Sequence, residues 1–207
     1  MRRLLQSIEN LKKTKIKILI DKRIKEFKQT GKKSSNEIFK ELCFCILTAN
    51  STAERCIDVQ LKVGNGFLNL SESQLQKTLK KCRARFHTKR AGYISEARKY
   101  KNSITKIIKS KDETKAREWL VKNIKGLGHK EASHFLRNIG YDNYAIIDFH
   151  IIDILKKHNL ITRPKTITKN KYLEIENILK KIANKANLNL AELDLYLWYK
   201  ETRKVLK

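Results

Sequence analysis

Apolar residues recur every three or four positions along this chain, as they do on one face of an α-helix. This spacing runs through almost every segment of the sequence. Glycine and proline, which punctuate hairpins, are scarce: there are seven glycines and a single proline, Pro164. The pattern therefore predicts an all-α fold.

The helices expected from this spacing follow one another with short connections. A polar linker is predicted at residues 30–35, after one or two basic amphipathic helices in residues 3–29. Further helices are predicted at residues 34–46, 51–61, 75–79, 93–97, 104–108, 116–124, 130–139, 151–158, 172–186 and 189–198. Three helix starts carry the residues of a capping box, in which two residues three positions apart bond each other's backbone: Ser34 with Glu37, Ser51 with Glu54, and Asn189 with Glu192.

The segment of residues 124–148 combines two helices, a tight turn and a carboxylate. Gly126-Leu127-Gly128 separates two helical patterns, and the N–H groups that begin the second helix form a seat for phosphate. Along this second helix the apolar residues at positions 132, 135, 136 and 139 face the core, whereas Lys130, His134 and Arg137 lie on the other face. A short apolar run then leads to Asp148.

The charge of the chain indicates a polyanionic partner. Lysine and arginine number 47 against 21 acidic residues, which leaves a formal net charge of +26. This excess is greater than solubility requires, and it suits binding to phosphates. A lysine-rich proteome gives the same surface without a polyanion, so charge alone does not identify DNA.

Cysteine spacing and hydropathy exclude several other classes. Cys43, Cys45, Cys56 and Cys82 are separated by one, ten and 25 residues, which matches no zinc or iron–sulfur pattern, so reduced and mostly buried thiols are expected. No apolar run is long enough to span a bilayer, and the chain starts with an amphipathic helix instead of a secretory signal. A soluble intracellular protein of the cytoplasm or nucleoid is expected, with no contact to a membrane.

Two residues of the central segment could carry chemistry. A lysine is a nucleophile only as the free amine, which a helix N-terminus and neighbouring cations favour at Lys130. Most lysines are solvated surface charges, and that reading applies to Lys130 as to any other. Asp148 follows an apolar run, so it is expected to be partly buried and could stabilise a developing positive charge. Aspartate is also a good N-cap for a helix that starts at Phe149, and both roles are compatible.

The segment resembles the helix-hairpin-helix, Gly/Pro-rich loop and aspartate signature of DNA glycosylases. It is similar in detail to the short archaeal 8-oxoguanine DNA glycosylase/lyases that lack an iron–sulfur cluster. The resemblance extends from the helix that ends at Asn50 to the closing residues 204–207. One departure is Lys125, which stands where the superfamily usually has proline before the first hairpin glycine.

The resemblance implies a fold and a set of site residues. The fold would have two interleaved helical domains with the active-site cleft between them: a central domain of residues 31–139, and a terminal domain of residues 1–30 and 140–207. Lys130 would be the nucleophile and Asp148 the invariant aspartate. Predicted DNA contacts are Gly126 and Gly128 of the hairpin, His150 at a helix start, and Asn50, Arg55 and Arg90 around the gap left by a flipped base.

The family resemblance also implies a pocket for the lesion base. Phe86, Asp194 and Trp198 would lie around the flipped purine, and Lys207 would lie close to it, with a free terminal carboxylate as acceptor. From the residues alone, these aromatics could equally belong to the core, Asn50 could be a corner residue, and the arginines could be surface charge.

The predicted function is a bifunctional base-excision repair enzyme, a DNA N-glycosylase with AP lyase activity. It would remove 8-oxoguanine from double-stranded DNA through a lysine Schiff base, nick the strand by β-elimination and act as a monomer. No cofactor or metal is expected, although the hairpin carbonyls could hold a monovalent cation. The alternatives are an oxidised-pyrimidine glycosylase of the endonuclease III kind, which the missing C-terminal cysteine cluster disfavours, and a non-catalytic helix-hairpin-helix DNA-binding protein.

Overall fold

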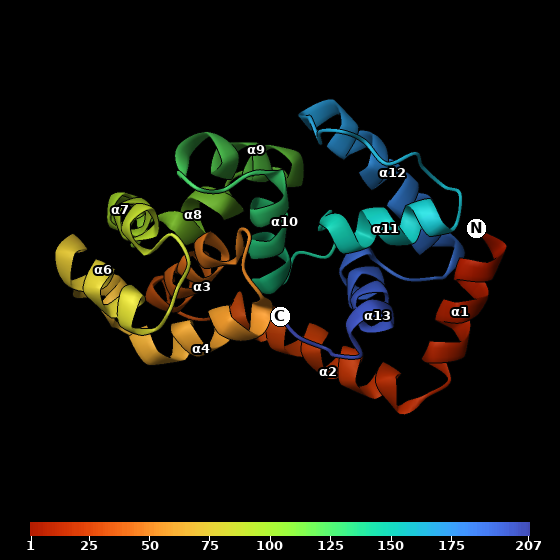
Figure 1. The fold of residues 1–207 in the computed structure, drawn as a ribbon, viewed down its shortest axis with the longest axis horizontal. Helices are drawn as coiled ribbons and strands as arrows, with labels where there is room; N and C mark the ends of the chain where they lie inside the picture. The colour runs from red at the N-terminus through yellow and green to blue at the C-terminus, as the bar shows by residue number, and fades with distance from the viewer.

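The computed structural model describes the backbone of residues 1–207 and every side chain except those of residues 113 and 114. Over this described backbone the chain forms helices and no strand, which confirms the predicted all-α class. The elements, shown in Figure 1, are α1 (Arg2–Lys12), α2 (Lys15–Thr30), α3 (Ser35–Thr48), α4 (Ala53–Val63), α5 (Gly66–Asn69), α6 (Glu72–Lys81), α7 (His87–Ala97), the 3-10 turn η1 (Arg98–Tyr100), α8 (Ile104–Lys109), α9 (Glu113–Asn123), α10 (His129–Asn138), α11 (Phe149–Lys157), α12 (Lys169–Lys185) and α13 (Leu190–Thr202).

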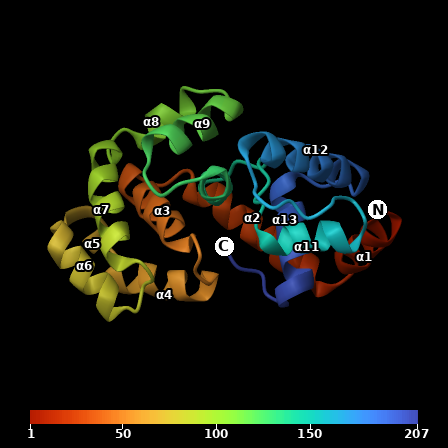
Figure 2. The same cartoon turned by 45° about the horizontal axis from the view of Figure 1, so that its top comes forward.

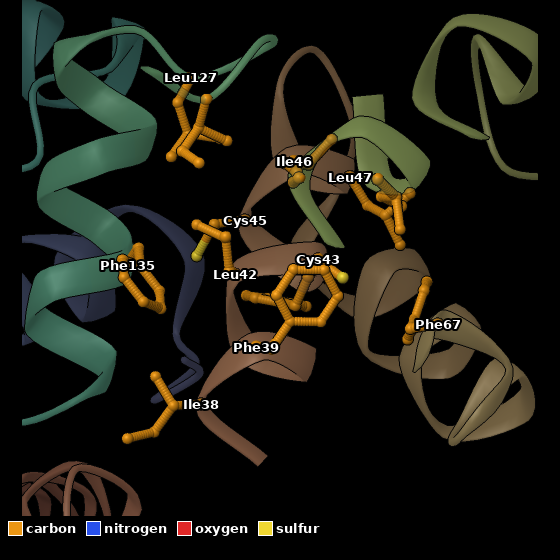
Figure 3. Close-up of a cluster of buried hydrophobic side chains, with 14 of the residues drawn as sticks. Ile38, Phe39, Leu42, Cys43, Cys45, Ile46, Leu47, Phe67, Leu127 and Phe135 are labelled. Atoms are coloured by element: carbon orange, nitrogen blue, oxygen red, sulfur yellow. The ribbon is translucent and has the colours of Figure 1, made fainter. Parts of the chain in front are cut away.

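One hydrophobic core is built around α3. This helix is buried on nearly all sides from Ile38 to Thr48, as its sequence predicts. Figure 3 shows its side chains between Phe135 of α10 on one side and Phe67 of α5 on the other. This core extends from Ile38 to Tyr144 along the chain.

A second core joins the two ends of the chain. Its N-terminal part comes from α1 and α2, between Leu4 and Phe27, and its C-terminal part from α11, α12 and α13, between Ala145 and Leu197. In Figures 1 and 2 the two cores form separate halves, with α10 and the C-terminus between them. The chain therefore passes from one core to the other twice.

The two passages, the segments around Gly31 and Gly140 in which the chain crosses between the cores, pack backbone against backbone. A Cβ at Gly31, which follows α2, would meet the carbonyl oxygen of Ile139 at 2.0 Å. A Cβ at Gly140, which follows α10 with φ of +96°, would meet the Cα of Lys28 at 3.0 Å. Glycine is therefore required at both places by close approach, and this contact fixes the two halves relative to each other.

Of the three predicted capping boxes, the one at α13 forms completely, the one at α3 forms only its Ser34 half, and the one at α4 is wrong. The side chains of Ser34 and Asn189 accept the predicted N-cap hydrogen bonds at α3 and α13. Ser51 does not cap α4, which starts after Thr52 without a side-chain cap bond. Instead, the Ser51 hydroxyl accepts a hydrogen bond from Arg90 Nη1 at 3.1 Å. The Ser51 hydroxyl therefore bonds Arg90, 39 positions away, in place of the backbone at the start of α4.

The cysteines are reduced and mostly buried, as expected. All four cysteines are free thiols; Cys43, Cys45 and Cys56 are buried, and Cys82 is partly exposed. Among the described residues, no helix is both long and apolar enough to cross a membrane.

Candidate active site

The turn between α9 and α10 is a tight hairpin that depends on one glycine. Gly126 has a φ of +86°, and a Cβ there would lie 2.6 Å from the Tyr93 ring, so only glycine fits without strain. Gly128 has a φ of −90° and is the N-cap of α10, and its N–H donates to Glu131 Oε2 at 3.3 Å. The sequence analysis predicts DNA contacts for both Gly126 and Gly128, but only Gly126 has a backbone conformation that requires glycine. Lys125, in the usual proline position, is exposed and pairs with Glu96 at 2.9 Å.

Lys130 lies in the first turn of α10, on the same face of that helix as His134 and Arg137. Its side chain is 27% exposed, and its Nζ lies 3.4 Å from Glu131 Oε1. An amine at this position is partly shielded from water yet accessible from the space between the two halves.

Asp148 ends the segment that leads from α10 into α11. Its Oδ1 accepts the Ile151 N–H at 3.0 Å, so it is the N-cap of α11, as one of the sequence readings holds. The carboxylate is half-buried, and the cap bond fixes its orientation at the mouth of the same space.

A cleft of about 850 Å³ opens between the two halves and brings most of the predicted residues together. This size falls in the roughly 300–1,000 Å³ range of small-molecule sites. The predicted site residues that line it are Asn50, Phe86, Lys130, Asp148, His150, Asp194, Trp198 and Lys207. The other four predicted contacts lie outside this lining as the described residues form it: Arg55, Arg90, Gly126 and Gly128.

The deepest charged groups of the cleft are a salt-bridged pair. Asp194 of α13 accepts from Arg137 Nη1 of α10, and both side chains are almost completely buried. Burial, opposed by Arg137 and assisted by Asp148, raises the pKa of Asp194 to about 6. The Arg137 guanidinium also bonds Asn138 and lies 4.8 Å from the Phe27 ring centroid. This pair therefore joins the two halves beneath the cleft.

His134 lies one turn after Lys130 and faces the same cleft. It is 7% exposed, packs edge-on against Phe44 at 5.6 Å, and neither ring nitrogen has a hydrogen-bond partner among the described side chains. Burial first, and then the cations Arg137, Lys130 and Lys207, hold its pKa well below the usual value, so the imidazole is neutral. Its spacing of four from Lys130 predicts that it lies on this face, but no role for it follows from the sequence.

Aromatic rings line the cleft on both sides. Phe86 is 53% exposed, has a left-handed φ of +52°, and packs against the guanidinium groups of Arg85 and Arg90. On the opposite half, the ring of His150 lies between those of Trp198, at 5.0 Å, and Phe149, at 4.0 Å. Phe149 is 61% exposed and was missed by sequence reasoning, since it reads as the first residue of a helix.

The corner before α4 is held together by arginines. Arg90 is buried, and besides Ser51 it donates to the Ala49 carbonyl, so its guanidinium is engaged inside the protein and is not presented to solvent. Arg85 Nη1 donates to the Asn50 carbonyl at 2.7 Å, and Asn50 itself is exposed with a φ of +54°. Arg55 is exposed near the start of α4.

Lys207 reaches across from the terminal half and anchors in the central half. Its Nζ lies 2.7 Å from Glu41 Oε2, donates to Gln60 and sits 4.3 Å from the Phe44 ring centroid. The buried Glu41 carboxylate also accepts from Asn138 at 2.7 Å. The ammonium is thus occupied by protein groups, whereas Leu206 and Lys207 line the cleft. Among the described residues, no cluster of histidine, cysteine or acidic side chains could hold a metal ion.

Comparison with known proteins gives consistent matches over the whole chain. Residues 20–188 match the profile of the family described as 8-oxoguanine DNA glycosylase. The chain is 57% identical to the 8-oxoguanine DNA glycosylase/AP lyase of Methanocaldococcus jannaschii over 99% of each chain. It is 48% identical to that of Korarchaeum cryptofilum, over 99% of this chain and 98% of the relative.

Solved structures match equally well. One is the crystal structure of the M. jannaschii 8-oxoguanine glycosylase/lyase in complex with a 15mer DNA containing 8-oxoguanine, with a TM-score of 0.97, 56% identity and coverage of 99% of this chain and 100% of that one. Another is the 8-oxoguanine DNA glycosylase of Thermotoga maritima, with a TM-score of 0.94, 40% identity and coverage of 100% and 99%.

Proposed function

Because this chain belongs to the 8-oxoguanine DNA glycosylase family, we propose that Lys130 is the nucleophile with which it removes 8-oxoguanine from DNA and then nicks the abasic strand. The enzyme is a bifunctional DNA glycosylase and AP lyase of base-excision repair. The observation that carries the assignment of Lys130 is its position: it lines the same interdomain cleft as Asp148, at the start of the helix that follows the hairpin.

The glycosidic bond becomes accessible only when the damaged nucleotide leaves the stack. We assign the base to the cleft, between the exposed ring of Phe86 and the partly buried ring of Trp198, with the main chain of Leu206 and Lys207 against its edge. The Lys207 ammonium takes no part in base recognition, since Glu41 and Gln60 hold it. The N-termini of α10 and α11, together with His150, contact phosphates, and the net charge of +26 supports binding without sequence preference.

Lys130 then attacks C1′ of the sugar as the free amine. The C1′–N9 bond breaks, its electron pair leaves with the purine, and the purine takes up a proton. Asp148 stabilises the positive charge that develops on the sugar, an electrostatic effect that is strong in a site closed to water. Opening of the sugar ring and loss of a proton from the amine leave a Schiff base between Lys130 and C1′. Removal of a proton from C2′ expels the 3′ phosphate by β-elimination and nicks the strand.

Trapping with borohydride tests the nucleophile directly, because it reduces the Schiff base to a stable amine. A covalent adduct between the protein and an 8-oxoguanine duplex is expected for the wild type and should be lost in Lys130→Gln. Lys171→Gln is the matched control: Lys171 also lies in the first turn of a helix, pairs with a nearby carboxylate, Glu174, at 2.7 Å, and lies outside the cleft.

An adduct that persists in Lys130→Gln would assign the nucleophile to another amine. Tight DNA binding by the wild type, with neither adduct nor nick, would reduce the protein to a binding module. A duplex with thymine glycol, assayed in parallel, distinguishes oxidised pyrimidines from oxidised purines as the substrate.

A further inference from the structure

The segment that leads to Asp148 is buried but belongs to no helix, so its backbone groups need partners from side chains. Two residues of α12 supply them. Tyr172 OH donates to the Ala145 carbonyl at 2.6 Å and accepts the Ile147 N–H at 3.3 Å. Glu176 Oε2 accepts the Ala145 N–H at 3.0 Å. The backbone immediately before Asp148 is thus held by two side chains four positions apart on one helix face.

Glu176 is in turn fixed from the central half. Arg117 of α9 donates to both carboxylate oxygens, at 2.6 and 3.0 Å, with both side chains almost completely buried. Arg117 and Tyr172 each also lie 3.3 Å from the Ser133 hydroxyl of α10. Charge-assisted bidentate bonds of this kind fix orientation as well as distance. The network therefore joins α9, α10 and α12 to the linker before Asp148.

Tyr172 is the member of this network that contacts the chain neighbours of both proposed catalytic residues. Its hydroxyl bonds Ile147, the neighbour of Asp148, and its ring packs against His129, the neighbour of Lys130, with centroids 5.6 Å apart. His129 is itself bonded to Glu118 at 3.0 Å. Burial raises the pKa of the Tyr172 phenol, so the hydroxyl stays protonated and donates to Ala145.

We propose that Tyr172 is a positioning residue, whose hydroxyl sets the register of the linker and thereby the placement of the Asp148 carboxylate relative to Lys130. Tyr172 contacts neither residue's functional group and acts through Ile147 and Ala145. The proposal rests on the catalytic roles assigned above to Lys130 and Asp148.

Tyr172→Phe tests this with the loss of a single oxygen. The Ile147 N–H and Ala145 carbonyl lose this partner, while the ring keeps its contact with His129. Single-turnover excision of 8-oxoguanine is expected to fall about 10- to 100-fold. The dissociation constant for the uncleaved duplex should change less than about two-fold, because the DNA-facing surface is unchanged. Tyr196→Phe, in the same core on α13, is the control and should excise at the wild-type rate.

A double-mutant cycle with Asp148→Asn distinguishes positioning from general loosening of the fold. If Tyr172 acts through Asp148, its replacement has little further effect once the carboxylate is gone. An equal loss in both backgrounds, or wild-type excision by Tyr172→Phe, would overturn the proposal. Wild-type excision by Asp148→Asn alone would instead refute the role of the aspartate. All variants are compared at a temperature where circular dichroism shows each fully folded.

Discussion

Replacing Gly31 by alanine perturbs the place where the chain passes between the two cores. The residue has a φ of −65° and a ψ of −13°, which alanine adopts without strain. Its N–H donates to the Phe27 carbonyl at 3.1 Å, and alanine keeps that bond as well. The added methyl group is thus the only change, and it would lie 2.0 Å from the Ile139 carbonyl oxygen.

The size of the effect follows from this distance. Carbon and oxygen approach no closer than about 3.3 Å even in weak C–H···O contacts, so one passage must move by about 1.3 Å. The obstacle is backbone, which cannot rotate away as a side chain end would. Overpacking costs about 1–3 kcal/mol, and the upper half of that range is expected here. For a chain of this length, a loss of about 2–3 kcal/mol lowers Tm by roughly 4–12 °C.

Thermal unfolding followed by circular dichroism measures this loss. The matched control is Gly92→Ala, within α7, where a Cβ would make an ordinary contact of 3.4 Å with Glu72 and where alanine favours the helix. Its Tm is expected to stay unchanged or rise. Single-turnover excision by Gly31→Ala should also slow, because Lys130 and Asp148 lie on opposite sides of the second passage. A Tm within about 1 °C of the wild type would show that the passages are not tightly packed.

One further substitution and one extension of the chain test the site itself. Asp148→Asn should keep DNA binding but lower single-turnover excision at least about 100-fold; since asparagine is as good an N-cap as aspartate, unchanged excision would mean that the residue only caps α11. A short glycine–serine extension after Lys207 should lower the preference for 8-oxoguanine over guanine about 10-fold with little change in Tm, because Leu206 and Lys207 line the cleft; equal preference with and without the extension would contradict their contact with the base.

The helices were predictable from the sequence because helical periodicity is a local property, whereas most of the cleft residues were predicted through the family resemblance. The spacing of apolar residues located α10, and the positions of Lys130, His134 and Arg137 placed them on one face. Periodicity does not show whether this polar face of α10 meets water or another part of the protein. Polar residues opposite a core face normally meet water, but His134 is buried against Phe44 of the central half, and Arg137 is buried against Phe27 and Asp194 of the terminal half. Whether the polar face of α10 is buried depends on the tertiary fold and not on the local sequence pattern.

The misread residues share a second cause, which is competition from partners distant in sequence. Ser51 has the residues of a capping box around it, yet Arg90 takes its hydroxyl. Arg90 in turn is withdrawn from the surface where its charge suggested it would lie. The anchoring of Lys207 by Glu41 spans 166 positions, and the bond from Arg117 to Glu176 spans 59. No local pattern carries such information.

The buried cysteines bear on how the enzyme withstands the conditions that create its substrate. An oxidant attacks a thiol through its thiolate, and only where it can reach the sulfur. Burial raises the pKa of Cys43 and Cys45 well above the usual value, and raises that of Cys56, whose Sγ also donates to the Leu47 carbonyl at 3.1 Å. These three sulfurs lie in the central core with α3 and α4, protonated and out of reach. These three thiols of the scaffold that carries the hairpin are therefore protected from the chemistry that turns guanine into 8-oxoguanine.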